Sequence, residues 1–222
     1  MSDSGYTSLC ITPSPVPRVP KSERTKAVIL NAAIEFLWAR PLRDLTVAEL
    51  MRPTGLSRSA FYQYFTDLHV LMQALQDVIQ DEIFAAAGPW IEGVGDPVTL
   101  MREAIDRLVR VCYDRGPLIR ALSDAATTDA VFEQAWRGFL QAFDDAATAR
   151  IEEDQRQGLI PDLDARPVAF ALNRLDASTL IAAFGQHPRL DPEPVRESLA
   201  RIWISTLYGT ECLDSDSGLV RT

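Results

Sequence analysis

Long apolar runs are missing from this 222-residue sequence. Its apolar clusters are short and broken by charged residues, and none approaches the ~20 residues that a helix needs to cross a bilayer. The first twenty residues lack the basic start and apolar stretch of a secretory signal. Apolar residues make up 47% of the chain and charged residues 24%, which is typical of a globular protein rather than a disordered one. We therefore expect a soluble, cytoplasmic protein without a membrane partner.

Cysteine and histidine are scarce. The three cysteines are odd in number and far apart in the sequence, which suits a reducing compartment better than a disulfide framework. Neither histidine, His69 or His187, follows a glutamate at the spacing of di-iron helical bundles. No cysteine pair has zinc-ligand spacing, and no glycine-rich phosphate loop is present. The sequence therefore predicts a protein that is not an enzyme and that uses no metal or cofactor.

Alternation with period two, the signature of a half-buried strand, is also missing. Apolar residues recur instead at helical spacing along most of the chain, separated by Pro, Gly and helix-capping residues. The sequence therefore predicts an all-α fold. The expected helices begin at the caps Ser22, Thr46, Ser57, Asp67 and Asp96, with breaks at Gly88-Pro89 and Gly116-Pro117, a short helix from Leu118, an apolar stripe from Phe132 to Ile151, and two last helices at about 164–185 and 192–212.

Charge is distributed unevenly along the chain, whose formal net charge is −9. Residues 20–67 contain seven Lys or Arg against five acidic residues, whereas the chain from residue 68 onward contains 14 basic and 25 acidic residues. Positive charge on a protein strengthens its binding to nucleic acid. A mildly basic head on an acidic body fits a DNA-binding module joined to a second unit.

Residues 46–65, TVAELMRPTGLSRSAFYQYF, combine a short helix, a glycine turn and a capped second helix. Thr46 is a good N-cap, with Glu49 three residues on to complete a capping box. Pro53 should end the first helix because it disfavours helical geometry in the residue before it, and Gly55 is free to adopt a positive φ. A helix-turn-helix of this kind lays one helix across the phosphate backbone while the next enters the major groove with its N-terminal end.

The second of these helices carries the candidate DNA contacts. Arg58 and Ser59 occupy its leading end, where side chains reach base edges, and the Gln63 amide suits adenine. Hydroxyl groups suit phosphate contacts, which fix the register of the protein on DNA. The candidate phosphate contacts are Thr46, Ser57, Tyr62 and Tyr64, and Leu56, Phe61 and Phe65 are expected to pack inward. From the pattern alone, a helical protein in which the tyrosines merely pack is an equally good interpretation.

The same segment resembles the fingerprint of the TetR family of transcriptional regulators. The residues that carry the resemblance are Thr46, the turn Gly55-Leu56-Ser57, and the ending Phe61-Tyr62-Gln63-Tyr64-Phe65. The segments ALNRLDASTLIAAF and RIWISTLYG are similar to the last two helices of a mycobacterial member of that family. The resemblance implies a homodimeric repressor that binds a pseudo-palindromic double-stranded DNA operator and is released by a small molecule bound among the C-terminal helices.

The sequence departs from the family pattern at three positions. Leu68 stands where the family usually has a basic residue that meets phosphate, with His69 next to it. Met51 replaces a small residue near the turn, and Pro53 stands where a helix commonly continues. We expect the fold to survive these changes, whereas the phosphate anchor and the angle of the recognition helix are in doubt.

The candidate ligand site lies in the second half of the chain. The helix expected at 164–185 places Asn173 among apolar neighbours, and burying its amide without a partner would cost ~1–3 kcal/mol. A ligand carbonyl or amide would satisfy Asn173, and so would a backbone carbonyl or water. The resemblance favours a pocket, whereas periodicity alone favours a filled core. The candidate apolar walls are Trp136, Phe139, Phe143 and Trp203, and Asp176 is a possible second polar contact.

A second apolar side of the 164–185 helix needs cover of its own. It comprises Ala171, Leu172, Leu175 and Ala182, and the last helix adds Val195, Leu199, Ile202, Trp203, Thr206 and Leu207. Together these helices predict a homodimer built as a four-helix bundle.

We expect four parts in the chain: a flexible Pro-rich arm at 1–20, a helix-turn-helix DNA-binding domain at 21–67, a larger helical ligand-binding and dimerisation domain at 68–213, and a flexible tail at 214–222. The alternative is a helical small-molecule-binding or interaction protein of the same fold that no longer binds DNA specifically.

Overall fold

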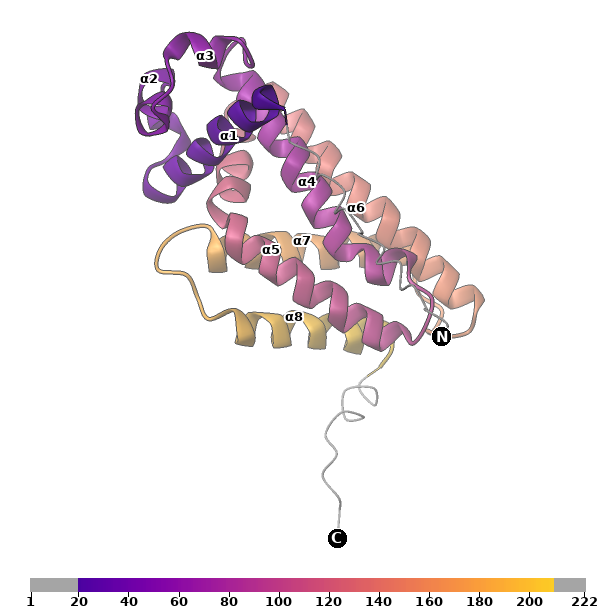
Figure 1. The fold of residues 1–222 in the computed structure, drawn as a ribbon. Coiled ribbons are helices and arrows are strands. Elements are labelled where there is room, and N and C mark those ends of the chain that lie inside the picture. Colours follow the sequence, from indigo (N-terminus) through magenta and orange to yellow (C-terminus); the bar gives the residue numbers. More distant parts are fainter. Residues whose placement is uncertain (1–19, 210–222) are drawn as a thin grey trace, which may run out of the picture.

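The structure, a computed structural model, describes residues 20–209. The expected tail and all but the last residue of the expected arm lie outside these residues. Every regular element within them is a helix, which confirms the all-α prediction (Figure 1). The helices are α1 (Lys21–Ala39), α2 (Val47–Met51), α3 (Arg58–Tyr62), α4 (Leu68–Glu92), α5 (Pro97–Ala125), α6 (Ala130–Arg156), α7 (Ala165–Phe184) and α8 (Pro192–Leu207), with 3-10 turns at Leu42–Asp44 and Arg52–Thr54.

Helices α1 to α3 form a small head, and the caps of α2 and α3 and the turn between these helices are those that the local sequence predicts. The Thr46 hydroxyl accepts the backbone N–H of Glu49 at 3.1 Å and caps α2, and the Ser57 hydroxyl accepts that of Ala60 at 3.2 Å and caps α3. Between them Gly55 adopts a φ of 69°, as expected. The two short helices are thus held at a fixed angle by side-chain caps and one left-handed residue.

Three details of the head differ from prediction. Helix α1 begins one residue before Ser22, directly after Pro20, so Ser22 lies in its first turn instead of capping it. The Glu49 carboxylate does not complete the capping box because it accepts a bond from Arg40 Nη1 at 2.8 Å. Helix α3 ends at Tyr62 rather than at Phe65, and the following residues turn the chain into α4.

The two Gly-Pro pairs do not break the helices. Helix α4 continues through Pro89 to Glu92, and α5 runs unbroken through Pro117 to Ala125. The glycine at position 116 is explained by tertiary packing and not by a helix end, because a Cβ there would collide with the carbonyl group of Phe184 on α7. Gly116 therefore allows two helices to approach closely, and the loss of one helical hydrogen bond at Pro117 is tolerated.

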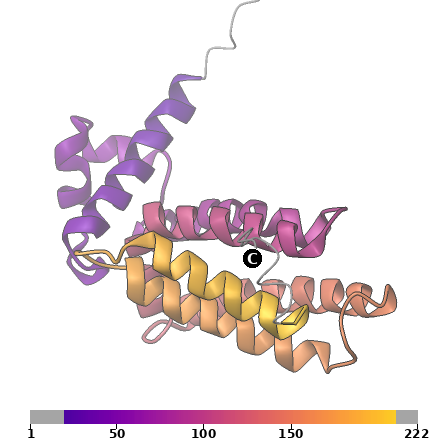
Figure 2. The ribbon, with the colours of Figure 1, turned by 90° about the horizontal axis from the view of Figure 1, so that it is seen from below.

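Helices α4 to α8 form the body of the molecule, and α5 is central to it. Helix α5 packs against α4, α7 and α8 and also meets α1, while α6 packs against α7 (Figure 1). Seen from below, α7 and α8 run side by side and the head lies at one end of the body (Figure 2). No helix within residues 20–209 combines the length and the apolar character needed to cross a bilayer.

The loop between α7 and α8 joins the head to the body. The ring of His187 lies 4.7 Å from that of Trp38 on α1. The Arg189 guanidinium lies 4.8 Å from the centre of the Trp38 ring and 3.7 Å from that of Tyr113 on α5. Arg189 also donates a hydrogen bond to the Tyr113 carbonyl at 2.7 Å. One arginine thus contacts both α1 and α5.

Candidate DNA-binding head and ligand cavity

Helix α3 presents the predicted base-reading residues to solvent. Arg58, Ser59 and Gln63 are exposed, and 60% of Tyr62 is accessible. The opposite side of the segment is anchored by two rings, Phe61 and Phe65, which are almost completely buried and lie 5.6 Å apart. Leu56 and Tyr64 are half-buried and pack against the same core, so Tyr64 is less available to phosphate than Tyr62. The exposed side of α3 is free for a partner.

The capping hydroxyls retain donor capacity. Thr46 and Ser57 each use an oxygen lone pair to accept a backbone N–H. A hydroxyl group has one donor hydrogen in addition, and an exposed Thr46 can direct it to a phosphate oxygen. Ser57 and Ser59 lie 2.8 Å apart through their hydroxyl oxygens, so one donor of this pair is used internally and the other is not engaged by this contact.

Two arginines of the head are engaged by one carboxylate. Arg40 and Arg52 both contact Glu49, at 2.8 and 3.1 Å. Arg58 takes part in none of the ion pairs among residues 20–209. Arg58 is therefore the cation that the structure leaves free at the leading end of α3.

Leu68, at the position of the expected phosphate anchor, and its neighbour His69 face the body. Leu68 packs against the core. The ring of His69 stacks on Phe132 of α6 with 4.5 Å between ring centres, and its Nε2 lies 3.5 Å from the Asp129 carboxylate. His69 therefore contacts the start of α6 and does not extend the candidate DNA-binding surface.

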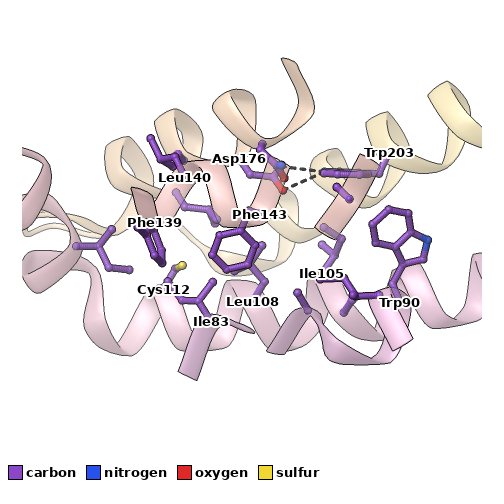
Figure 3. Close-up of a pocket in the computed structure, with 18 of the residues that line it drawn as sticks. Ile83, Trp90, Ile105, Leu108, Cys112, Phe139, Leu140, Phe143, Asp176 and Trp203 are labelled. Atoms are coloured by element: carbon purple, nitrogen blue, oxygen red, sulfur yellow. Dashed lines mark hydrogen bonds between the residues drawn. The ribbon is translucent and has the colours of Figure 1, made fainter. Parts of the chain in front are cut away.

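The body encloses a cavity of about 100 Å³ between α4, α5, α6, α7 and α8 (Figure 3). All six predicted ligand residues line it: Trp136, Phe139, Phe143, Asn173, Asp176 and Trp203. Sequence reasoning missed the walls from α4 and α5, which include Ile83, Trp90, Met101, Ile105, Leu108 and Cys112. Those residues belong to regular helical stripes, and the only distinctive signal among them was the tryptophan. The space is large enough for several water-sized groups, and its walls are almost entirely apolar.

A single carboxyl group stands at this cavity. Asp176 of α7 is 7% exposed, and its two oxygens accept the indole N–H of Trp203 at 3.1 and 3.0 Å (Figure 3). Burial raises the pKa of Asp176 from 3.8 to about 7, against the opposing effect of the Trp203 hydrogen bond. Burial and the nearby Asp176 raise the pKa of the Cys112 thiol, which stays protonated. Asp176 is therefore the group on the cavity wall that can carry charge near neutral pH.

Asn173 lies one helical turn before Asp176 and has a protein partner. Its Nδ2 donates to Asp144 Oδ1 at 3.0 Å, a partner on α6 that the sequence did not suggest. Asp144 is buried and also accepts two hydrogen bonds from Arg174, at 3.2 and 2.9 Å. The amide is thus oriented by an ion pair, and no described group bonds its oxygen.

A polar chain lies beyond Trp203 at the other end of the wall. The Trp90 ring contacts the Trp203 ring edge-on at 5.4 Å. Trp90 Nε1 donates to the Tyr208 hydroxyl at 2.7 Å, and that hydroxyl donates to the buried Asp154 carboxylate at 2.7 Å. Arg150 lies 2.9 Å from Asp154 and balances its charge. Unlike Asp154, Asp176 forms no ion pair with a cation within residues 20–209.

The expected dimer face is only partly available. On α8, Val195, Leu199, Trp203 and Leu207 are buried in the chain's own core, which corrects their assignment to a subunit contact. Ile202 and Thr206 remain exposed. On α7, Leu172 is buried, Leu175 is half-buried, and Ala171 and Ala182 are exposed. Phe170, which was not singled out from the sequence, is 52% exposed.

Two family models match the chain, one on each part. The model described as bacterial regulatory proteins, tetR family, matches residues 29–75. The model of the C-terminal domain of the transcriptional regulator EthR matches residues 101–209. The first match contains the helix-turn-helix, and the second contains most of the cavity walls.

Among curated relatives, the HTH-type transcriptional regulator EthR of Mycolicibacterium smegmatis is 27% identical over 194 residues, which cover 86% of this chain and 89% of the relative. Among solved structures, a TetR-family regulator from Syntrophomonas wolfei aligns with a TM-score of 0.70 at 14% identity, covering 84% of this chain and 96% of the other. A transcriptional regulator from Saccharomonospora viridis, crystallised in complex with choline, aligns with a TM-score of 0.67 at 15% identity, covering 83% and 98%. These two structures share the fold of this chain.

Proposed function

Because the chain belongs to the TetR family of bacterial transcriptional regulators, we propose that it is a cytoplasmic repressor that binds a pseudo-palindromic operator as a homodimer and is released by a small apolar effector. One observation carries the DNA-binding part of the proposal. Arg58 and Ser59 are exposed at the leading end of α3, while Phe61 and Phe65 anchor the other side of the segment in the head's core.

This arrangement suits entry into the major groove. A recognition helix contacts base edges with its N-terminal residues, and an arginine at that end matches guanine O6 and N7 with two hydrogen bonds. We assign base contacts to Arg58, Ser59 and Gln63, and phosphate contacts to Thr46, Ser57 and Tyr62, with a lesser part for Tyr64. The residues at 21–67 then act as the DNA-binding domain and those from 68 onward as the ligand-binding and dimerisation domain.

The cavity supports the effector part. Small-molecule sites are mostly apolar with a few polar groups that fix orientation, and the cavity has this character. The six residues Trp136, Phe139, Phe143, Asn173, Asp176 and Trp203 are assigned to the effector. The Saccharomonospora viridis regulator was crystallised with choline, so a protein of this fold accommodates a small organic molecule.

The dimer is assigned to the outward sides of α7 and α8, where Phe170, Ala171, Ala182 and Ile202 are exposed. Exposed apolar residues on two adjacent helices suit a two-fold contact in which each helix meets its copy. Light scattering at micromolar concentration should give twice the 24.7 kDa mass of the chain. A monomeric mass would refute the dimer.

A salt-titrated binding assay on the DNA upstream of the chain's own coding region tests the repressor. We expect affinity to fall steeply as salt rises, because phosphate contacts release counterions. Arg58→Ala should weaken specific binding by ~1–3 kcal/mol and leave binding to random DNA much less affected. Arg137→Ala, an exposed arginine of α6 paired with Glu133, is the matched control and should behave as wild type.

Two outcomes would count against this assignment. Equal losses on specific and random DNA in Arg58→Ala would restrict Arg58 to phosphate contact. No specific retention at any salt would favour the alternative function, a small-molecule-binding protein of the same fold without specific DNA binding. The inward-facing Leu68 and His69 are the observation on which that alternative depends.

A further inference from the structure

The cavity wall contains a buried carboxyl group that no cation in the described part of the chain balances. Within residues 20–209, the ion pairs engage Asp144 and Asp154 but not Asp176. The described partner of Asp176 is one neutral donor, the Trp203 indole, shared between its two oxygens. A carboxylate oxygen can accept more than one hydrogen bond, so acceptor capacity remains unused at this point of the cavity.

The second polar group on the wall is an acceptor as well. The Asn173 amide nitrogen is engaged by Asp144, which is itself fixed by Arg174, so rotating the amide would break that bond. This leaves the Asn173 oxygen as the group free for a ligand. Asn173 and Asp176 are three residues apart on α7, which places them on one side of the helix. The wall therefore offers two hydrogen-bond acceptors within an apolar cavity.

A ligand that matches this wall must donate hydrogen bonds and should carry positive charge. We propose that the effector has an amine, protonated in solution, whose N–H groups bind the Asp176 carboxylate and the Asn173 oxygen while its apolar body fills the cavity. This inference rests on the proposed effector function and names the chemical class of the effector. An ammonium group supplies three donors and the missing countercharge, whereas an effector carboxylate would face two acceptors and be rejected.

The protonation state of Asp176 gives the proposal a pH signature. The other titratable residue that lines the cavity is Cys112 of α5, whose thiol stays neutral, and α4, α6 and α8 contribute apolar and indole side chains. Behind the wall, Asp144 and Arg174 form an ion pair with each other. With a pKa of about 7 for Asp176, amine binding should be about tenfold weaker at pH 6 than at pH 8, because Asp176 must first lose its proton.

The test uses the full chain and three probes with the same eight-carbon tail: n-octylamine, 1-octanol and octanoate. Isothermal titration calorimetry at pH 8 should give octylamine an affinity at least about tenfold above that of octanol, and octanoate the lowest of the three. Asp176→Asn should reduce the amine preference to about twofold, because octylamine then loses its charge interaction whereas octanol has none to lose. Asp145→Asn, which removes one negative charge from an exposed ion pair with Arg166 on the outside of α6 and α7, should keep the preference.

The outcomes separate this inference from the function on which it rests. If octanol binds but octylamine has no advantage, or if Asp176→Asn retains the advantage, the amine assignment is overturned while the apolar cavity stands. If none of the three probes binds, both the cavity function and the amine assignment are overturned. Thermal unfolding of each variant establishes that it is folded before its affinities are compared.

Discussion

Replacing Asp176 by asparagine should stabilise the ligand-free protein at neutral and alkaline pH. The two side chains have nearly the same shape, and the asparagine oxygen can still accept the Trp203 indole N–H. The difference between them is the charge, which in wild type is buried without a cation. Burial raises the pKa of Asp176 from 3.8 to about 7, so the folded state resists ionisation of this group.

The magnitude follows from proton linkage. Between about pH 4 and pH 7 the folded protein keeps a proton on Asp176 that the unfolded chain has released, so the free energy of unfolding falls as pH rises. A tenfold difference in proton affinity is worth about 1.4 kcal/mol. The free energy of unfolding therefore falls by about 4 kcal/mol in total, and about 3 kcal/mol of this decrease occurs between pH 5 and pH 8. Asparagine does not titrate, so the variant should gain that amount over wild type across this interval.

Urea unfolding of both proteins at pH 5, 6, 7 and 8 measures this difference. Asp145→Asn removes a charge from an exposed pair and should show no comparable gain. A difference between Asp176→Asn and wild type that is the same at all four pH values would refute the reasoning. So would a loss of stability that grows with pH, because it would mean that the carboxylate is well stabilised in the folded state.

Two further predictions concern packing and hydrogen bonding. Gly116→Ala should lower the free energy of unfolding by about 1–3 kcal/mol, because its Cβ would collide with the Phe184 carbonyl group. Gly138→Ala, in open space on α6, should raise the free energy of unfolding by about 0.5–1 kcal/mol. Thermal unfolding of the two variants tests this difference, and equal effects would contradict the close approach of α5 and α7. Tyr208→Phe should lower the free energy of unfolding by about 1–3 kcal/mol, because Trp90 and the buried Asp154 both lose a partner. An unchanged urea midpoint would contradict that expectation.

Local features of the fold were predictable where one short segment contains all the determinants. The caps at Thr46, Ser57, Asp67 and Asp96 each accept a backbone N–H three residues ahead. A capping residue carries this information in its own sequence neighbourhood. The left-handed turn at Gly55 was predictable for the same reason. The caps of α2 and α3 and the turn between them could therefore be predicted from the sequence alone.

Longer-range features were not predictable from such patterns. Gly116 was interpreted as a helix end, because nothing in its own neighbourhood indicates that Phe184 lies against it. Periodicity alone favoured a filled core around Asn173, whereas the family resemblance favoured the cavity that Asn173 lines. Neither indicated its partner Asp144, which lies 29 residues away on α6. Four of the α8 residues assigned to a dimer, Val195, Leu199, Trp203 and Leu207, are buried against the chain's own core. A single apolar stripe cannot indicate whether it is covered by the same chain or by another one.

The arrangement of α4 also bears on how an effector would influence DNA binding. Its first turn follows directly on the recognition segment and contacts α6 through His69, while its later turns line the cavity through Ile83, Trp90 and Ile91. A helix of 25 residues is about 37 Å long and transmits a displacement at one end to the other. Arg189 fixes α1 against α5 at a second point. In the proposed repressor dimer, an effector that shifts the cavity end of α4 while this second contact holds would rotate the head, and two rotated heads would no longer match half-sites at a fixed spacing.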